Sequence, residues 1–284
     1  MPPRIAAVIA TINLREKLRT TLKTLFDQDF KFSYRVIVID SGSKDGSIEM
    51  VQEEFPEVEL VIDPSRPGLN QKMNLALKLT RDQNYIALLN NDIRLQTNYL
   101  TVLSDFMENC PEAGVVGPLV RDNRGIYYNG GDFLMKIGNF GVKRYPTNTQ
   151  VPYVAGAAFF FRREALKNVR FDERIHFTTD VAICFAIASH GWRCYVTDST
   201  EVFHDTHSST SRSMATSLYF HSVKDHMQVI RQFMPIYIPV FVLFRLKGVL
   251  LLIGAGLVHR NFERLFEAAA IIRGLFGTGK ALTA

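Results

Sequence analysis

Two aspartates in the N-terminal half follow segments that have the pattern of buried strands. Asp40 ends the run 35–40, and Asp92 closes an Asn-Asn-Asp turn after the run 85–89. The carboxyl ends of parallel strands meet at one rim of a sheet, where open α/β sheets bind their ligands, so we expect both carboxylates there. Asp40 suits a contact with a base or ribose. Asp92 suits a hard cation such as Mg²⁺, which takes one or two carboxylates together with substrate phosphates. Alone, Asn-Asn-Asp is also typical of an ordinary turn.

The segments around these aspartates alternate between strand and helix patterns. Leu14, Leu18, Leu22 and Leu25 recur at helical spacing after the first apolar run, and the alternation predicts parallel βαβ units. Between residues 114 and 152, glycines and prolines scattered among aromatic residues predict loops and short strands. The expected strands are residues 5–11, 35–40, 58–62, 85–89 and 192–196, and a later helix is expected at 179–190.

The composition is that of a folded protein with an anionic partner. Hydrophobic residues make up 47% of the 284 residues and charged residues 21%, which excludes a disordered chain. A net charge of +5 suits a nucleic acid, an anionic membrane or a phosphorylated substrate, but no basic run or reader motif supports nucleic acid. Cys110, Cys184 and Cys194 are odd in number and lack CxxC spacing, so we expect no disulfide framework and a reducing compartment. The short apolar N-terminus predicts a strand, not a signal peptide, and a cytoplasmic protein.

The last fifty residues differ from the rest. Ile236–Val258 is almost wholly apolar but contains Pro239, Arg245 and Lys247. A spanning helix needs about 20 apolar residues, so these interruptions predict a buried hairpin or an interfacial pair of helices rather than a span. A helical apolar stripe at 262–272 favours attachment to a membrane surface. Intramolecular packing or a dimer interface would explain the same stripe.

A series of short segments occurs in one order between residues 5 and 210. The segments are Val8-Ile-Ala-Thr-Ile-Asn13, Ile39-Asp-Ser-Gly-Ser-Lys-Asp-Gly-Ser47, Gly68-Leu-Asn-Gln-Lys-Met-Asn74, Leu88-Leu-Asn-Asn-Asp-Ile93, Gly156-Ala-Ala, Arg162-Arg-Glu-Ala-Leu166, Phe171-Asp-Glu173, Thr179-Asp-Val-Ala-Ile-Cys184, Gly191-Trp192 and Val202-Phe-His204. In this order they resemble the family 2 inverting glycosyltransferases of the A-type fold, particularly the bacterial rhamnosyltransferase-like branch. The resemblance implies an α/β fold with a Rossmann-like nucleotide-sugar-binding lobe at 1–125, packed on an acceptor-binding and catalytic-base lobe at 126–232. Residues 233–284 would form C-terminal apolar and amphipathic helices that associate with a membrane or dimerise.

The resemblance also implies a donor-binding set in the first lobe. Thr11 and Asn13 would line the nucleotide pocket, Asp40 would reach the base or ribose, and Lys72 would face the phosphates. The glycine of the set would allow close backbone approach to the donor. Asp45 either belongs to this pocket or caps the following helix. The full set is Thr11, Asn13, Asp40, Ser43, Gly68, Lys72 and Asn91.

A metal site is implied by the same comparison of motifs. Asp92 takes the last place of the family's DxD-like motif, whose first place is occupied by Asn90, and it is the expected metal contact. His204 takes the place of a metal- or diphosphate-contacting histidine, with His207 as a nearby competitor. The implied cofactor is Mg²⁺ or Mn²⁺.

Asp180 matches the acidic residue that serves the family as catalytic base. Inversion requires the acceptor hydroxyl to attack opposite the departing diphosphate, so a carboxylate must take its proton on the acceptor side. We expect the helix N-terminus to lower the pKa of Asp180. A capping aspartate is the plainer interpretation of an isolated residue. Thr179 and Ala182 stand where acidic residues are common in the family, which bears on acceptor recognition.

The implied function is a metal-dependent, inverting hexosyltransferase of bacterial cell-surface glycan synthesis. Its donor would be a dTDP- or UDP-sugar, with rhamnosyl from dTDP-rhamnose the best match, and its acceptor a polyprenyl-linked or polysaccharide hydroxyl. It would act in the cytoplasm, associated peripherally with the inner face of the membrane, and could form a homodimer. A degenerate, non-catalytic transferase that acts as a membrane scaffold is the alternative. Sugar-phosphate nucleotidyltransferases fit less well, because Thr11-Ile-Asn-Leu-Arg-Glu16 contains no glycine.

Overall fold

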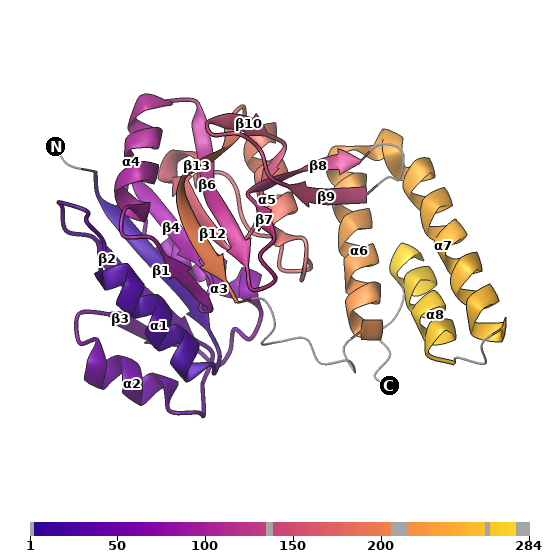
Figure 1. The fold of residues 1–284 in the computed structure, drawn as a ribbon, viewed down its shortest axis with the longest axis horizontal. Helices are drawn as coiled ribbons and strands as arrows, with labels where there is room; N and C mark the ends of the chain where they lie inside the picture. Colours follow the sequence, from indigo (N-terminus) through magenta and orange to yellow (C-terminus); the bar gives the residue numbers. More distant parts are fainter. Residues whose placement is uncertain (1–2, 135–138, 206–214, 259–261, 277–284) are drawn as a thin grey trace. The chain divides into compact units, whose positions relative to one another are not determined.

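The computed structural model describes residues 3–134, 139–205, 215–258 and 262–276. Its N-terminal part is the predicted series of parallel βαβ units, in which β3, β2, β1 and β4 lie side by side (Figure 1). Each neighbouring pair is parallel, and the expected strand positions are confirmed. The elements are β1 (Ile5–Thr11), α1 (Arg15–Phe26), β2 (Arg35–Asp40), α2 (Ser47–Glu54), β3 (Glu59–Ile62), α3 (Leu69–Leu79) and β4 (Tyr85–Leu89).

The sheet continues beyond β4 with strands from the second half of the chain. Its order is β10-β13-β6-β12-β4, with β5 paired to β13 and β7 to β6. β12 runs antiparallel to β4, whereas β13 runs parallel to β6. The strand expected at 192–196 is the first part of a longer strand, β13, whose pairing is irregular between Val196 and Glu201. These elements are β5 (Ile93–Leu95), α4 (Tyr99–Asn109), β6 (Ala113–Asp122), β7 (Tyr127–Tyr128), β10 (Thr149–Val151), β12 (Ala158–Arg162), α5 (Thr179–Ser189) and β13 (Arg193–His204).

Helix α5 packs against β6 through a glycine. A Cβ atom at Gly114 would lie 2.7 Å from the side chain of Ile187 and 2.8 Å from that of Trp192. The missing side chain therefore lets the helix approach the strand closely. This contact positions α5, the helix whose second residue is Asp180.

The described residues form two compact units. Among them, 3–131, 142–173 and 180–205 belong to one unit, which contains the large sheet, and 132–134, 139–141, 174–179, 215–258 and 262–276 belong to the other. A small sheet has the order β11-β8-β9. Its strands are β8 (Gly130–Leu134), β9 (Asn139–Lys143) and β11 (Tyr153–Val154). The division into functional lobes at 1–125, 126–232 and 233–284 stays a prediction.

The second unit contains three helices, α6 (Ala215–Phe233), α7 (Ile238–Val258) and α8 (Phe262–Phe276), which pack together (Figure 1). Their core includes Val223, Ile230, Phe241, Val249 and Ile271. Of the two alternatives expected at 236–258, the buried hairpin is wrong, because α7 is one continuous helix; the interfacial pair of helices stays a prediction.

Helix α7 continues through its proline and its charged residues, and the structure shows why. Pro239 lies in the first turn of the helix, where its missing N–H has no intrahelical partner to lose. The Arg245 guanidinium lies 5.0 Å from the centre of the Phe241 ring and 3.3 Å from Nδ1 of His226. Packing thus accommodates this charge within the helix bundle. Within the described residues, 235–255 is long and apolar enough to cross a membrane, and few of its residues are buried.

Candidate active site

Asp92 and His204 lie side by side at the carboxyl rim of the large sheet. β13 pairs with β5 so that His204 is opposite Ile93, and this register brings Nε2 of His204 to 3.3 Å from Oδ1 of Asp92. Nδ2 of Asn90 is also 3.3 Å from Nε2 of His204. The sheet therefore assembles the predicted metal pair from two distant segments. The competing residue, His207, lies outside the described residues.

The chemistry of this pair fits a divalent cation. A carboxylate oxygen suits Mg²⁺ or Mn²⁺, and an imidazole nitrogen adds affinity for transition metals such as Mn²⁺. The hydroxyl of Tyr128 lies 3.3 Å from Nδ1 of His204. If this hydroxyl accepts a hydrogen bond from a protonated Nδ1, Nε2 carries no proton and its lone pair points toward Asp92. A metal requires this tautomer of the imidazole.

Tyr128 is the residue of this rim that the sequence did not indicate. It is placed by the pairing of β6 with β7, which sets Tyr128 opposite Val120. Burial raises its pKa to about 12, and the nearby carboxylates of Asp122, Asp180 and Asp92 act in the same direction. The phenol therefore remains protonated and available as a hydrogen-bonding partner of His204. Tyr128 lies in a strand of only two residues, both tyrosines, so no motif or periodic spacing in the sequence marks it.

Asp180 lies at the start of α5, and its Oδ1 accepts a hydrogen bond of 2.9 Å from the N–H of Val181. The expectation of a lowered pKa is wrong, because burial raises the pKa of Asp180 to about 6 against the opposing effect of backbone N–H groups that include that of Gly156. Loss of hydration disfavours the ionised form more than the helix N-terminus favours it. The result is a carboxylate with a pKa closer to neutrality, which makes it a stronger base than an ordinary aspartate.

A glycine connects Asp180 to the metal pair. A Cβ atom on Gly156 would lie 3.0 Å from Cβ of Asp180, so the backbone of this segment fits closely against the carboxylate. In the next residue, the carbonyl of Ala157 accepts a hydrogen bond of 3.1 Å from the N–H of Asn90. The candidate base and the candidate cation ligands therefore share one rim of the sheet.

The predicted donor-binding residues form a connected network beside this rim. Nδ2 of Asn91 donates to Oγ1 of Thr11 at 2.8 Å, and the N–H of Asn13 donates to Oγ of Ser43 at 2.6 Å. Oγ1 of Thr11 donates to the carbonyl of Asn13 at 3.2 Å. Asp40 is 1% exposed and accepts three hydrogen bonds, two from the N–H groups of Gly42 and Ser43 and one from the Ser43 hydroxyl. Its carboxylate shapes the loop, and its contact with a base or ribose stays a prediction.

Two further members of the donor set have local roles in α3. Nζ of Lys72 donates to Oγ of Ser41 at 2.8 Å, and burial lowers the pKa of its ammonium group. Gly68 precedes α3 with φ of −76°, a conformation open to other residues. Its N–H donates to the side chain of Gln71 at 3.2 Å. The predicted phosphate and donor contacts of Lys72 and Gly68 stay untested.

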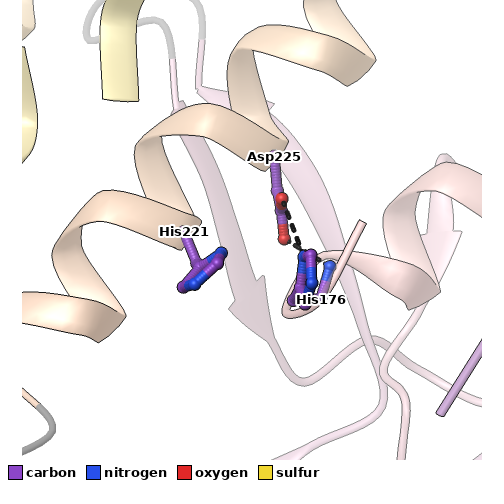
Figure 2. Close-up of side chains that lie close together, drawn as sticks. All are labelled: His176, His221 and Asp225. Carbon is purple, nitrogen blue, oxygen red and sulfur yellow. Dashed lines mark hydrogen bonds and ion pairs between the residues drawn. The ribbon is translucent and has the colours of Figure 1, made fainter. Parts of the chain in front are cut away.

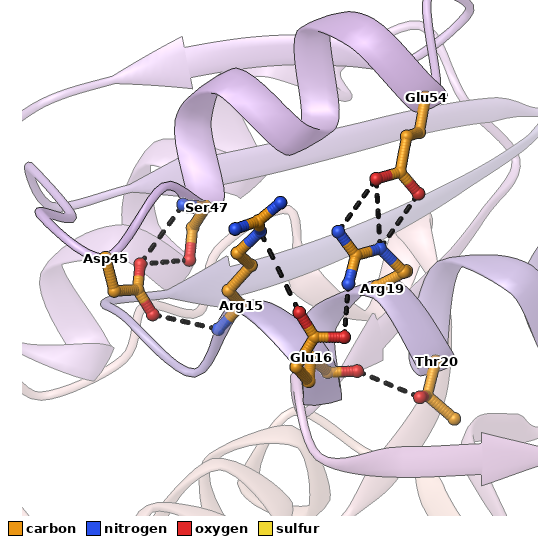
Figure 3. A network of polar contacts seen from close by, with 7 residues as sticks. All are labelled: Arg15, Glu16, Arg19, Thr20, Asp45, Ser47 and Glu54. Atoms are coloured by element: carbon orange, nitrogen blue, oxygen red, sulfur yellow. Dashed lines mark hydrogen bonds and ion pairs between the residues drawn. The ribbon is translucent and has the colours of Figure 1, made fainter.

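Asp45 precedes Gly46, the N-cap residue of α2, and its carboxylate binds the first residue of the helix (Figure 3). Its Oδ1 accepts from the N–H of Ser47 at 3.1 Å and from Oγ of Ser47 at 2.5 Å. Its Oδ2 accepts from the N–H of Arg15 at 2.9 Å. The same region carries ion pairs of Arg19 with Glu16 and with Glu54. This polar network joins α1 to α2.

A hollow of about 360 Å³ opens beside Asp92. It is bordered by Lys17 and Asp205, which form an ion pair of 3.0 Å, and by Phe203. Arg94 lies 4.1 Å from the centre of the Phe203 ring. Asp92 is thus accessible through this hollow.

Comparisons of the sequence with known proteins find a family and two relatives. The family model "Glycosyl transferase family 2" matches residues 6–170. The N-acetylglucosaminyl-diphospho-decaprenol L-rhamnosyltransferases of two Mycobacterium tuberculosis strains, CDC 1551 / Oshkosh and H37Rv, are each 24% identical over 218 residues, which cover 66% of this chain and 71% of the relative.

Solved structures of transferases share the fold. The Pyrobaculum calidifontis mannosyltransferase with GDP-Man and Mn²⁺ has a TM-score of 0.65 at 18% identity, covering 98% of this chain and 89% of that one. Residues 1–349 of S. aureus TarS with UDP-GlcNAc give 0.62 at 15%, covering 96% and 81%. GalNAc-T7 with UDP, GalNAc and Mn²⁺ gives 0.64 at 15%, covering 81% of this chain, which spans about half of that protein (48%). These likenesses confirm the predicted A-type fold.

The raised pKa of Asp180 predicts that Asp180→Asn stabilises the protein at neutral pH. The neutral carboxyl is favoured in the folded state, so its contribution to stability is fully present below about pH 4 and is lost as the pH rises through about 6. At pH 7.5 the asparagine variant should gain on the order of 1–2 kcal/mol in the free energy of unfolding, and this gain should vanish near pH 4. Urea unfolding followed by circular dichroism at both pH values measures the difference.

Asp122→Asn is the matched control, with the opposite expected sign. Although burial opposes its charge, hydrogen bonds from Ile126 and Arg124 hold the pKa of Asp122 below its usual range. Its substitution should destabilise the protein at pH 7.5. A loss of stability in Asp180→Asn at pH 7.5 would show that Asp180 is a structural cap.

Proposed function

The chain belongs to glycosyl transferase family 2, and from this premise we propose that it transfers a sugar, with inversion, from a nucleoside diphosphate to an acceptor hydroxyl. The observation that carries the proposal is the placement of Asp180 on the same rim as the pair of Asp92 and His204. Inverting transfer needs a base for the acceptor proton and neutralisation of the departing diphosphate. The rim provides groups suited to both tasks.

In this proposal Asp180 is the catalytic base. With a pKa of about 6, it is mostly ionised at pH 7.5 and can take a proton from the acceptor hydroxyl as the new bond forms. Gly156 leaves room for the carboxylate, and the N–H of Val181 orients it. No covalent nucleophile takes part.

Asp92 and His204 would hold Mg²⁺ or Mn²⁺. When bound, such an ion offsets the negative charge that develops on a departing diphosphate. Tyr128 fixes the ring of His204 through Nδ1. Asn90 contacts the same ring through Nε2.

The donor and acceptor are proposed from the curated relatives and from the charge of the chain. The names of the M. tuberculosis relatives specify an L-rhamnosyl group and a diphospho-decaprenol acceptor, which supports dTDP-rhamnose as donor and a polyprenyl-linked acceptor here. The solved structures hold UDP, UDP-GlcNAc or GDP-Man, so a UDP-sugar is the second donor to test. A role in cell-surface glycan synthesis would follow.

Exposed apolar side chains on α7 and α8 support attachment to a membrane. Leu250 is 71% exposed and Leu243 67% on α7, and Phe266 is 54% exposed on α8. Lys247, also exposed, lies midway along α7, and a charge at the centre of a spanning helix costs about 2.5–3.5 kcal/mol. We therefore favour a peripheral position at the cytoplasmic face, where the net charge of +5 attracts anionic lipids. A homodimer through these helices stays the alternative.

Asp180→Asn should lower kcat by at least 100-fold, because it removes the proton acceptor. Release of nucleoside diphosphate is measured with dTDP-rhamnose or UDP-sugars, Mn²⁺ or Mg²⁺, and a polyprenyl-diphosphate-linked GlcNAc acceptor. For the parent, kcat/KM should fall to half near pH 6 as Asp180 takes a proton. Asp105→Asn, at an exposed position on α4, should behave like the parent. Turnover of Asp180→Asn at the parent's rate would overturn the role of the base; donor binding without turnover by the parent on every acceptor would favour the scaffold alternative.

Tyr128→Phe should raise the Mn²⁺ concentration for half-maximal activity by about 10-fold, because loss of a hydrogen bond behind a metal-bound histidine weakens metal affinity by 10–100-fold. The readout is initial rate against Mn²⁺ concentration at saturating donor. Tyr127→Phe, at the exposed neighbour, is the control and should leave this concentration unchanged. An unchanged value in both variants would remove Tyr128 from the site.

Leu250→Glu and Phe266→Glu should each reduce binding to vesicles of phosphatidylglycerol and phosphatidylcholine by about 10-fold, since each buried apolar side chain contributes about 1.5–3 kcal/mol. Sedimentation of the vesicles measures bound protein, and binding should weaken as salt is added. Ile126→Glu, an exposed position outside these helices, should bind as the parent does. Protein that resists extraction from cell membranes by alkaline carbonate would show a spanning helix.

A further inference from the structure

Two histidines and an aspartate, none of which has been given a role above, converge in the second compact unit (Figure 2). His221 and Asp225 lie on α6 four residues apart, a spacing that puts both on one face of the helix. His176 comes from the segment 174–179. One ligating atom from each of the three side chains lies within 4.8 Å of the others.

The carboxylate is held in a fixed orientation. Asp225 is 1% exposed, and its Oδ2 accepts hydrogen bonds of 2.7 Å from the N–H groups of both His176 and Phe177. Its Oδ1 is buried without a hydrogen-bond partner and lies 4.0 Å from Nδ1 of His176. A buried carboxylate oxygen that accepts no hydrogen bond is costly. Because the two N–H groups occupy Oδ2, Oδ1 is the oxygen left to act as a ligand.

The two imidazoles are close enough to share a ligand. Their ring centres are 4.5 Å apart, and the ring of His221 is packed between those of Phe177 and Phe220. Burial and the neighbouring His176 lower the pKa of His221. Nδ1 of His221 is buried without a hydrogen-bond partner.

We propose that His176, His221 and Asp225 bind a divalent transition metal, with Zn²⁺ the best match. Two imidazole nitrogens and one carboxylate oxygen are a ligand set of Zn²⁺ sites, whereas Mg²⁺ prefers oxygen ligands alone. Ligands at about 2.0–2.1 Å in a tetrahedral site lie about 3.3 Å apart. The ring of His176, whose side chain is 48% exposed, can move inward to reach that separation. The fourth position is left to water.

The ion would tie the segment 174–179 to α6. That segment leads directly into α5, whose second residue is Asp180. Asp225 already links the two elements through its hydrogen bonds and its ion pair with His176, and the rings of His176 and His221 are in contact; an ion would add bonds from all three side chains. The metal would therefore have a structural role, distinct from that of the cation proposed at Asp92 and His204.

The test uses the full chain carrying Asp92→Ala and His204→Ala, which removes the other candidate metal site. After dialysis against EDTA, the protein is titrated with Zn²⁺, and bound metal and Tm are measured; Co²⁺ supplies a visible absorption spectrum that reports imidazole ligands. We expect one equivalent of Zn²⁺ at this site and a rise in Tm. Adding His176→Ala should abolish that equivalent and weaken Zn²⁺ binding by at least about 100-fold, more than the loss of a neighbour behind the ligands would cause.

The controls separate metal binding from folding. His176→Ala truncates a half-exposed side chain and should leave the Tm of the metal-free protein unchanged, and Asp225→Asn should also lose the Zn²⁺-dependent rise. His190→Ala, at an exposed histidine beyond the end of α5, should keep both the equivalent and the rise. The proposal is overturned if His176→Ala and Asp225→Asn retain the bound equivalent, or if the starting protein binds no Zn²⁺; the cluster is then an ion pair of His176 with Asp225.

Discussion

The pairing of β12 with β4 is the contact on which the candidate active site depends. The strands are antiparallel with Ala158 opposite Leu89, and this register places Ala157 against Asn90 and Gly156 against Asp180. Both strands are apolar and buried on both faces, so a slip of one residue would exchange side chains of different size between the two packed faces. The packing of the hydrophobic core, and not the interactions among the polar groups, therefore sets where the polar groups on the rim lie.

The rim brings several carboxylates close to one tyrosine. The carboxylates of Asp122, Asp180 and Asp92 all act on the pKa of Tyr128, although burial is the larger cause of its shift. Burial also makes Asp180 reluctant to ionise. Holding this carboxylate ionised costs folding free energy, and in the proposed function it makes Asp180 a stronger base. Carboxylates with shifted pKa values are common at functional sites. A cation held by Asp92 and His204 would offset part of that charge, so the proposed base and the proposed metal suit one another.

The second unit follows a different physical principle. Its three helices bury one set of apolar side chains against each other and leave Leu243, Leu250 and Phe266 exposed. A water-soluble bundle would not need such exposure, whereas a membrane surface would cover it. The charged residues of α7 predicted a break, yet the helix continues, because intrahelical hydrogen bonds do not depend on side-chain polarity and Arg245 packs on Phe241.

The sequence by itself determined the strands and helices of the first half and the rim position of Asp40 and Asp92. Through its resemblance in motif order it also indicated that Asp92 and His204 lie together. Periodicity reports local structure and burial patterns, and strand ends in parallel units share an edge, so these inferences needed no long-range information. Only the tertiary structure decided that Tyr128 contacts His204, that Asp40 is engaged by its own loop, and that Asp225 meets His176. It also reversed the expected pKa shift of Asp180. Each of these depends on which distant segments meet and on how much water they exclude from a group. The spacing of residues along the chain reports neither the contacts nor the burial.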